Sequence, residues 1–232
     1  MRAQGITPKR LGTTAYAVLG LLSLRDWTTY ELAQQMERGI GRMWGASPSM
    51  VYEEPKHLVA HGYATVTETP VGRRPRVRYS ITKKGRRALA DWLANDPAPL
   101  TLQFEGLLKV LFSDQGADDA NRSLLEAIHT WATEARATAQ SRAKGYIDGD
   151  YIAGAPLGER AVIVAQTLSF LSELYTLIEG WSAWASQLID ADDATDHATK
   201  VFAAIAAGRS PMRVRLVGAG AATSNRSAAP AR

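Results

Sequence analysis

The chain has 232 residues, of which 46% are hydrophobic and 22% charged; this composition suits one large or two small folded domains and excludes a collagen-like or disordered chain. It contains no cysteine, which excludes disulfides, thiolate metal sites and cysteine nucleophiles, and we expect a cytoplasmic protein. The formal net charge is +4, but residues 1–95 carry 15 basic and 7 acidic side chains, a net of +8, whereas residues 96–207 carry 7 and 16, a net of −9. The basic first part of the chain therefore favours a polyanionic partner.

Three short helices are predicted at the start of the chain. Residues 13–24 are apolar on nearly every face, which is typical of a short buried helix. Thr28 and Glu31 have the spacing of a capping box, so a second helix is expected to begin at Thr28. A third helix should begin at Ser47, with a kink or break at Pro55, because an interior proline loses a hydrogen bond and clashes with the preceding turn.

A hairpin and a fourth helix follow. Residues 63–68 and 76–82 alternate between apolar and polar side chains, which predicts two antiparallel strands. The segment 69–75 between them contains two prolines and a glycine, which is typical of an exposed hairpin tip. A helix is expected from Thr82, and the asparagine and prolines of residues 95–99 indicate a domain boundary.

The second half of the chain is predicted to be helical. Apolar residues recur at helical spacing over 102–111, then along a longer helix that is expected to end before Gly145. The longest apolar stripe has a spacing close to 3.5 residues, which is typical of a helix that packs along a partner helix. We assign five of its residues to dimerisation, namely Leu168, Leu171, Tyr175, Ile178 and Trp181. No run approaches 18 consecutive apolar residues, so we expect no membrane span.

These elements predict a mainly α-helical protein. Residues 1–95 are expected to form a winged helix-turn-helix with a two-stranded wing, and residues 96–207 an all-helical dimerisation domain. Residues 208–232, rich in alanine, glycine and serine with five arginines, are expected to be a disordered basic tail.

In a winged helix-turn-helix, the N-terminal end of the third helix contacts base edges, and an arginine-rich wing can follow the phosphate backbone or enter a minor groove. We therefore expect double-stranded DNA as the partner. The candidate DNA-binding residues of the third helix are Ser47, Ser49, Met50, Tyr52, Glu53 and Lys56, and those of the wing are Arg73, Arg74, Arg76 and Arg78.

The residues that carry this pattern resemble the PadR-like transcriptional regulators, a family named after the phenolic-acid repressor. The resemblance rests on the apolar first helix AYAVLGLLSL, the Tyr-Glu-Leu from Tyr30, a serine ahead of Tyr52, Leu58 with Gly62-Tyr63, and the Tyr-Ser-Ile-Thr-Lys-Lys-Gly of residues 79–85. It implies a helical C-terminal dimerisation domain, a DNA-contacting wing, and contact between Tyr52 and the DNA backbone. The chain departs from the common pattern at Glu54-Pro55, where members often have a leucine-bearing turn.

Other functions find less support in the sequence. A winged helix whose arginines grip an acidic protein partner remains an alternative to a DNA-binding homodimer. No nucleophile with an orienting base is evident, so we expect no enzyme and no cofactor. His57 and His61 have the spacing of two metal ligands but lack a third, so we expect no metal. A small aromatic effector could bind at tryptophans of the helical domain, namely Trp131, Trp181 and Trp184, although core packing is the simpler role for them.

Overall fold

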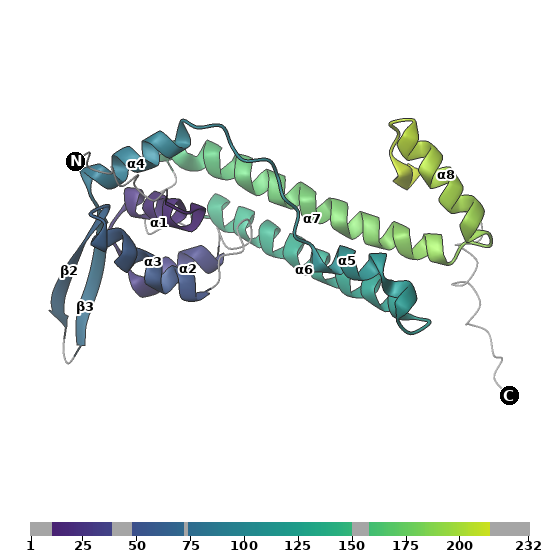
Figure 1. The fold of residues 1–232 in the computed structure, drawn as a ribbon, viewed down its shortest axis with the longest axis horizontal. Helices are drawn as coiled ribbons and strands as arrows, with labels where there is room; N and C mark the ends of the chain where they lie inside the picture. Colours follow the sequence, from purple (N-terminus) through teal and green to yellow (C-terminus); the bar gives the residue numbers. More distant parts are fainter. Residues whose placement is uncertain (1–10, 39–47, 72–73, 150–157, 214–232) are drawn as a thin grey trace, which may run out of the picture. The chain divides into compact units, whose positions relative to one another are not determined.

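A computed structural model describes residues 11–38, 48–71, 74–149 and 158–213 of the chain. The chain divides into two compact units, Met1–Leu100 and Thr101–Arg232. The first contains helices α1 to α4 and strands β1 to β3, and the described part of the second is made of helices and turns (Figure 1). The predicted fold class, a mainly helical chain that begins with a winged helix-turn-helix, is confirmed.

Helix α1 (Thr13–Leu24) forms the core of the first unit. Val18 and Leu19 have no exposed surface, and the following Trp27 is also fully buried. Helices α3 and α4 and strand β3 all pack against α1. Its apolar sequence on every face is therefore explained by neighbours on several sides.

Helices α2 (Thr29–Arg38) and α3 (Pro48–Ala60) pack against each other and make the helix-turn-helix pair. Helix α3 continues through Pro55, so the break that the sequence predicts there is absent. An interior proline costs a helix about 3 kcal/mol. The ring of Pro55 is among the fully buried side chains, and this burial offsets part of that cost.

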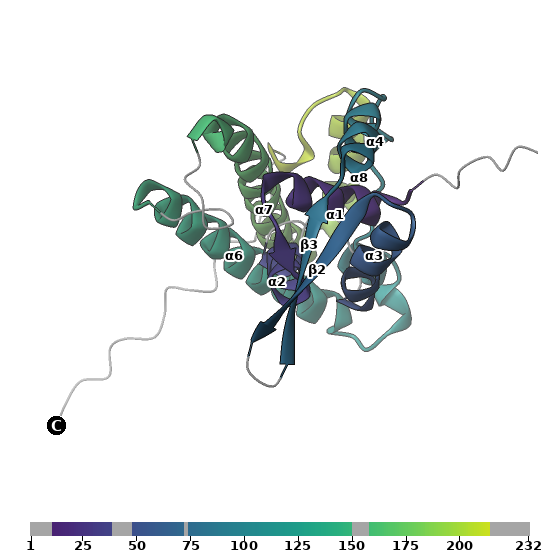
Figure 2. The same ribbon diagram turned by 90° about the vertical axis from the view of Figure 1, so that its left-hand side faces the viewer.

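The sheet has three antiparallel strands in the order β1-β3-β2, one more than the sequence predicts. Strands β2 (Ala64–Val71) and β3 (Arg74–Ile81) form the hairpin, which projects beyond the helices of the first unit (Figure 2). Both strands extend through the prolines of the expected tip, with Pro70 opposite Pro75. The additional strand β1 (Trp27–Thr28) pairs with β3 and has only two residues, too few for an alternating pattern.

Helix α4 (Lys83–Leu93) is the last helix of the first unit along the chain. The hydroxyl of Thr82 caps it by accepting a hydrogen bond from the amide of Gly85 at 3.0 Å, as the predicted start requires. Trp92 stacks on Tyr16 of α1 with 4.8 Å between ring centroids, whereas Leu93, two-thirds exposed, does not join the core.

The second unit contains α5 (Glu105–Leu111), α6 (Ala120–Ile147), α7 (Ala161–Ile189) and α8 (Ala194–Ala206). Helices α6 and α7 lie side by side along most of their length and make the main contact of this unit (Figure 1). Helix α6 continues through Gly145, beyond its predicted end.

Helix α7 buries some of the predicted dimerisation residues within the protomer and exposes other apolar side chains. Leu171 and Tyr175, two of the expected dimerisation residues, are buried against Ala135 and Ala139 of α6, and Leu168 packs beside them. These side chains therefore stabilise the protomer itself. Helix α7 exposes five large apolar side chains, and three of them, Ile163, Phe170 and Leu177, recur at a spacing of seven residues; the other two are Val162 and Ile189.

The same helix qualifies the expectation that no segment could span a membrane. Within Gly158–Ile189 an 18-residue window reaches a mean hydropathy of 1.5, and 11% of that window is buried. By length and composition the segment is long and apolar enough to cross a bilayer. One such helix is weak evidence for a membrane span, because a helix of a soluble protein can meet the same criterion.

Polar contacts also join α6 to α7. Glu179 of α7 accepts hydrogen bonds from Arg136 Nη2 at 3.1 Å and from the Thr133 hydroxyl at 3.0 Å. These hydrogen bonds, led by that from Arg136, hold the pKa of Glu179 below its usual value. Because burial of Leu171 and this ion pair both depend on the relative position of the helices, together they specify the register of the pair.

The end of the chain is described as far as residue 213. Gly208 has a positive φ of 65° and ends α8, and Pro211–Arg213 form one 3-10 turn. The predicted disordered tail therefore begins with ordered residues at 208–213. Its remaining part, residues 214–232, lies outside the described residues.

Candidate nucleic-acid interface

Helix α3 presents a polar face to solvent. Tyr52, Glu53 and Lys56 are all exposed, and the ammonium of Lys56 lies 2.7 Å from a carboxylate oxygen of Glu53. The hydrogen bond from Lys56 to Glu53, together with the charge of Glu53, raises the pKa of Lys56 above its usual value. Of the other predicted residues, Ser47 lies outside the described part, and Ser49 and Met50 are described by their helical backbone alone.

Three of the four predicted wing arginines lie on strand β3. Arg74, Arg76 and Arg78 occupy alternate positions and so share one face of the strand, while Tyr79, on the opposite face, is buried. Arg78 is half-buried near the base of the hairpin, opposite Thr67. Arg73 lies outside the described residues, and Arg74 and Arg76 are described by their backbone alone.

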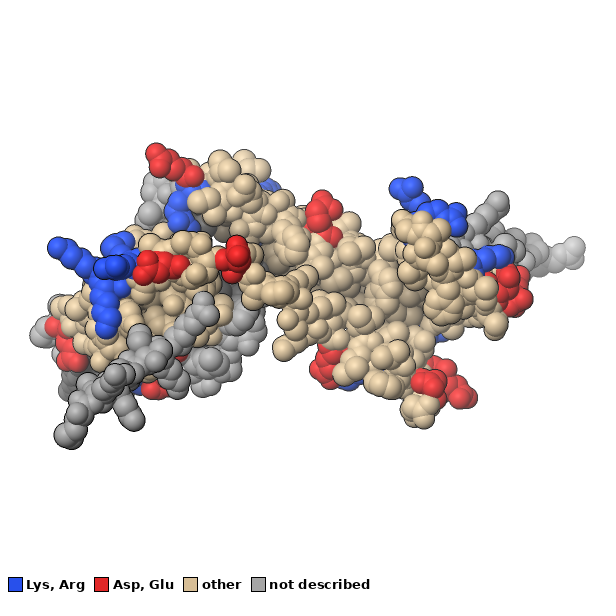
Figure 3. All heavy atoms as spheres, turned by 45° about the horizontal axis from the view of Figure 1, so that its top comes forward, with Lys and Arg blue, Asp and Glu red and all other residues tan. Residues whose placement is uncertain are grey.

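Exposed basic side chains continue onto α4. These side chains are not among the predicted DNA-binding residues, although four lie within the first five residues of the helix, namely Lys83, Lys84, Arg86 and Arg87. The ammonium of Lys84 donates to the His61 carbonyl at 2.8 Å and lies 4.4 Å from the ring centroid of Tyr63. Positive side chains gather on the first unit in the view of Figure 3. The density of basic residues at the start of α4 was visible in the sequence.

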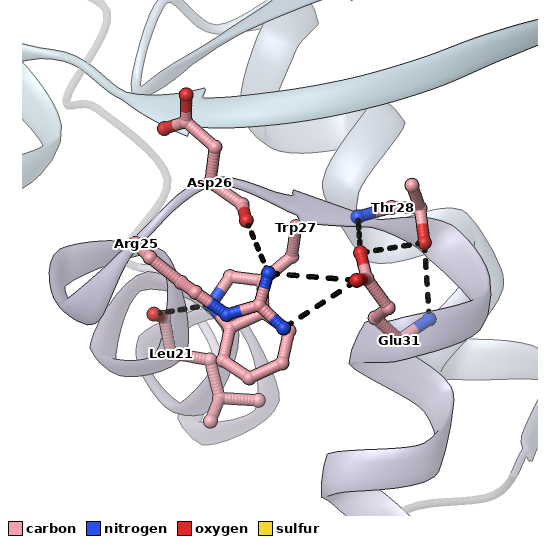
Figure 4. Close-up of polar contacts among 6 residues, drawn as sticks. All are labelled: Leu21, Arg25, Asp26, Trp27, Thr28 and Glu31. Carbon is pink, nitrogen blue, oxygen red and sulfur yellow. Dashed lines mark hydrogen bonds and ion pairs between the residues drawn. The ribbon is translucent and has the colours of Figure 1, made fainter. Parts of the chain in front are cut away.

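The capping box at the start of α2 is confirmed (Figure 4). The amide of Thr28 donates to Glu31 Oε2 at 2.8 Å, and the amide of Glu31 donates to the Thr28 hydroxyl at 3.2 Å. Thr28 also belongs to β1, where it pairs with Arg78. One residue therefore joins the first turn of the helix-turn-helix to the base of the wing.

Arg25, at the end of α1, also contacts this junction. Its guanidinium lies 3.7 Å from the ring centroid of Trp27 and 3.4 Å from Glu31, and the indole of Trp27 donates to the Leu21 carbonyl at 2.7 Å (Figure 4). Burial raises the pKa of Glu31, but the hydrogen bonds from Thr28 and the charge of Arg25 outweigh that effect and lower it overall. Glu31 is therefore ionised at neutral pH and bound on both sides.

The exposed face of α2 contains a further polar pair, which is not among the predicted DNA-binding residues. Tyr30 is 66% exposed, and the side-chain amide of Gln34 donates a hydrogen bond to its hydroxyl at 2.8 Å. Leu32 and Met36 are buried on the opposite face of the helix. The spacing of four residues between Tyr30 and Gln34 was the signal available in the sequence.

An effector site at Trp131, Trp181 and Trp184 of the second unit stays a prediction. Trp131 belongs to an aromatic cluster, with ring centroids 6.1 Å from Phe104 and 5.8 Å from Tyr175. An apolar hollow of about 480 Å³ lies beside this cluster along α5, and its lining includes Phe104 but none of the three predicted tryptophans. In the described part of the chain, no group of three or more acidic, histidine or cysteine side chains is placed to hold a metal.

The sequence is similar to known proteins. Residues 18–91 match the model of the transcriptional regulator PadR-like family. The negative transcriptional regulator PadR of Bacillus subtilis is 32% identical over 117 residues, which are 48% of this chain and 64% of that protein, so the alignment spans less than two thirds of the relative.

Solved structures share the fold. The crystal structure of Bacillus subtilis PadR with operator DNA matches 77% of this chain and 100% of its own, with a TM-score of 0.63 and 23% identity. A second structure of PadR, with p-coumaric acid, matches 77% of this chain and 96% of its own, with a TM-score of 0.56 and 23% identity. Helices α1 to α4, the β-hairpin and the matching family model agree on one assignment: residues 18–91 form a domain of the PadR-like transcriptional regulator family.

Proposed function

We propose that this protein regulates transcription by binding double-stranded DNA, as a homodimer, through helix α3 and the β2–β3 hairpin. One observation carries the proposal: an exposed polar face on α3, with Tyr52 and Lys56, belongs to the same compact unit as a projecting hairpin strand with arginines at alternate positions. A helix of this kind fits the major groove, and arginines suit the phosphates beside it. A structure with the same fold is bound to operator DNA.

Repression is the direction of regulation that we propose. The Bacillus subtilis relative is named a negative transcriptional regulator. A protein bound over a promoter excludes the polymerase, so an operator that overlaps the promoter is sufficient for this effect. The proposed operator is near-palindromic, because two identical subunits related by a two-fold axis place two recognition helices about 34 Å apart.

The exposed stripe of α7 supports the homodimer. Ile163, Phe170 and Leu177 are each more than half exposed and recur at heptad spacing. A straight apolar seam of this kind matches a second helix packed along it, and a second copy of the chain supplies an identical seam. The proposal therefore moves the dimer contact to this face of α7, away from the buried Leu171 and Tyr175.

A small aromatic effector is proposed as the signal. PadR of Bacillus subtilis has been solved with p-coumaric acid, a ligand of this class. The apolar hollow beside Phe104 and Trp131 has a volume of about 480 Å³, which suits a ligand of that size. Binding there would quench the fluorescence of Trp131, so titration with p-coumaric acid tests this part of the proposal separately.

Selection of bound sequences from random duplexes tests the main proposal. The expected result is an enriched motif with two inverted half-sites, whose centres are about 10 base pairs apart or a multiple of that distance. Enrichment of an asymmetric single site would contradict the homodimer. If no sequence is enriched and the protein instead binds an acidic polypeptide, the winged helix is a protein-interaction module and the proposal is wrong.

A further inference from the structure

Helix α2 carries an exposed tyrosine whose hydroxyl is already hydrogen-bonded on its acceptor side. Tyr30 is 66% exposed, and its hydroxyl oxygen accepts a hydrogen bond from the Gln34 side-chain amide at 2.8 Å. Since the oxygen acts as an acceptor toward Gln34, its own hydrogen is left to be donated. Within the described part of the chain, Gln34 is the hydrogen-bond partner of this hydroxyl, and it does not accept that hydrogen.

The helix that carries this donor is held firmly in place. The capping box of Thr28 and Glu31 fixes the first turn, and Arg25 fixes Glu31. Thr28 also pairs with Arg78 of the wing, so the first turn of α2, which carries Tyr30, is joined to the proposed DNA-binding hairpin. The backbone that carries Tyr30 is therefore held in place before DNA binds.

We infer that Tyr30, oriented by Gln34, donates a hydrogen bond to a DNA phosphate and extends the interface from α3 and the wing onto α2. A phosphate oxygen carries negative charge and only accepts hydrogen bonds, which matches a hydroxyl whose acceptor side is already occupied. In helix-turn-helix docking the first helix of the pair crosses the DNA backbone, which is where this contact falls. The inference rests on the proposed DNA binding.

The test compares Tyr30→Phe with the wild-type protein, using a duplex selected by the protein and a random-sequence duplex. The variant removes one exposed hydroxyl and keeps the ring, so the unfolding temperature should not change. We expect affinity for both duplexes to fall by about a hundredfold, because the loss of a hydrogen bond to a charged group costs about tenfold or more and a homodimer loses one in each subunit. Because a neutral hydroxyl displaces no counterion, the slope of log affinity against log salt should stay the same.

Two further variants make the test specific. Gln34→Met keeps the length of the side chain without its hydrogen bond and should weaken binding less than Tyr30→Phe. The double variant should bind like Tyr30→Phe alone, because both changes act on one contact. Tyr146→Phe, a matched loss of a tyrosine hydroxyl on α6 of the second unit, should bind like the wild type.

The outcomes separate this inference from the proposed function. Wild-type affinity in Tyr30→Phe would overturn the inference, and DNA binding by the wild-type protein would still stand. A loss confined to the selected duplex would also overturn it, since a phosphate contact does not depend on base sequence. If the wild-type protein binds neither duplex, both the proposed function and this inference are wrong.

Discussion

The carboxylate of Glu31 interacts with two neighbouring residues, Thr28 and Arg25. Thr28 supplies hydrogen bonds from its amide and its hydroxyl, both to Oε2 of Glu31, and Arg25 lies beside the other carboxylate oxygen while stacking on the buried Trp27. One carboxylate therefore links the end of α1, strand β1 and the first turn of α2. The ionised form is the one that these neighbours favour, and the lowered pKa of Glu31 expresses that preference.

Stability should depend on pH through this residue. The folded pKa of Glu31 lies below its ordinary value of 4.5, so its contribution is fully present above about pH 4.5 and is lost as pH falls through the folded pKa. Glu31→Gln, which keeps a capping side chain without the charge, should lower the free energy of unfolding at pH 7 by about 0.5 to 1 kcal/mol. Urea unfolding at pH 7 and at pH 3 measures the difference, which should shrink at the lower pH.

The control for this change is Glu37→Gln, an exposed glutamate at the other end of the same helix. It should show little difference from the wild type at either pH. A deficit of Glu31→Gln that persists unchanged at pH 3 would mean that the charge of Glu31 is not what stabilises the junction.

At the scale of helices and strands, elements with a strong local signal could be predicted from the sequence. The capping box of Thr28 and the alternation in β2 and β3 depend on neighbours a few residues away, and the structure confirms both. Strand β1 is too short for a pattern and exists because β3 pairs with it. Helix α3 continues through Pro55, whose ring is fully buried, and burial in the folded protein has no signal in the local sequence.

For the candidate site, the exposure of the α3 residues could be predicted from the sequence. The exposure of Tyr52, Glu53 and Lys56 follows from their position on a short helix that packs by its other face. The partner of an apolar stripe, in contrast, cannot be read from spacing alone. Leu171 and Tyr175 have the spacing of a dimer seam, yet α6 of the same chain covers them, because intrachain and interchain helix packing follow one periodicity.

Gly85 explains the close approach of α4 to the start of β2. A Cβ at this position would lie 2.1 Å from the carbonyl oxygen of Tyr63, which is backbone and cannot move aside cheaply. Gly85→Ala should therefore lower the free energy of unfolding by more than about 2 kcal/mol, as overpacking of a tight core does. Chemical denaturation of the two proteins measures this difference.

Gly20→Ala is the matched control, because nothing lies within 4 Å of a Cβ added at Gly20 in α1. Alanine favours a helix interior over glycine, so this variant should gain about 0.5 to 1 kcal/mol. Equal losses in the two variants would show that the approach of α4 to Tyr63 is not the cause.

At the scale of the whole molecule, the two faces of α7 should behave differently. Phe170→Glu with Leu177→Glu places charges on the exposed stripe, so the protein should become monomeric in sedimentation equilibrium and keep its helical circular dichroism. Leu171→Ala removes a side chain buried against α6 and should cost about 2 to 4 kcal/mol of folding stability. A double glutamate variant that remains dimeric would place the dimer contact on another surface.

The central claim, that a dimer binds DNA through α3 and the arginine-bearing hairpin, is tested most directly by the salt dependence of affinity. A dimer that contacts about six to ten phosphates should give a slope of log affinity against log salt of about −5 to −9 on its selected duplex. Replacing Arg73, Arg74 and Arg76 by alanine should reduce the steepness by about 0.9 for each phosphate that is no longer neutralised, whereas alanine at Lys109, Lys144 and Lys200 of the second unit should not. A flat response in the wild-type protein, or an unchanged slope in the arginine variant, would contradict the account.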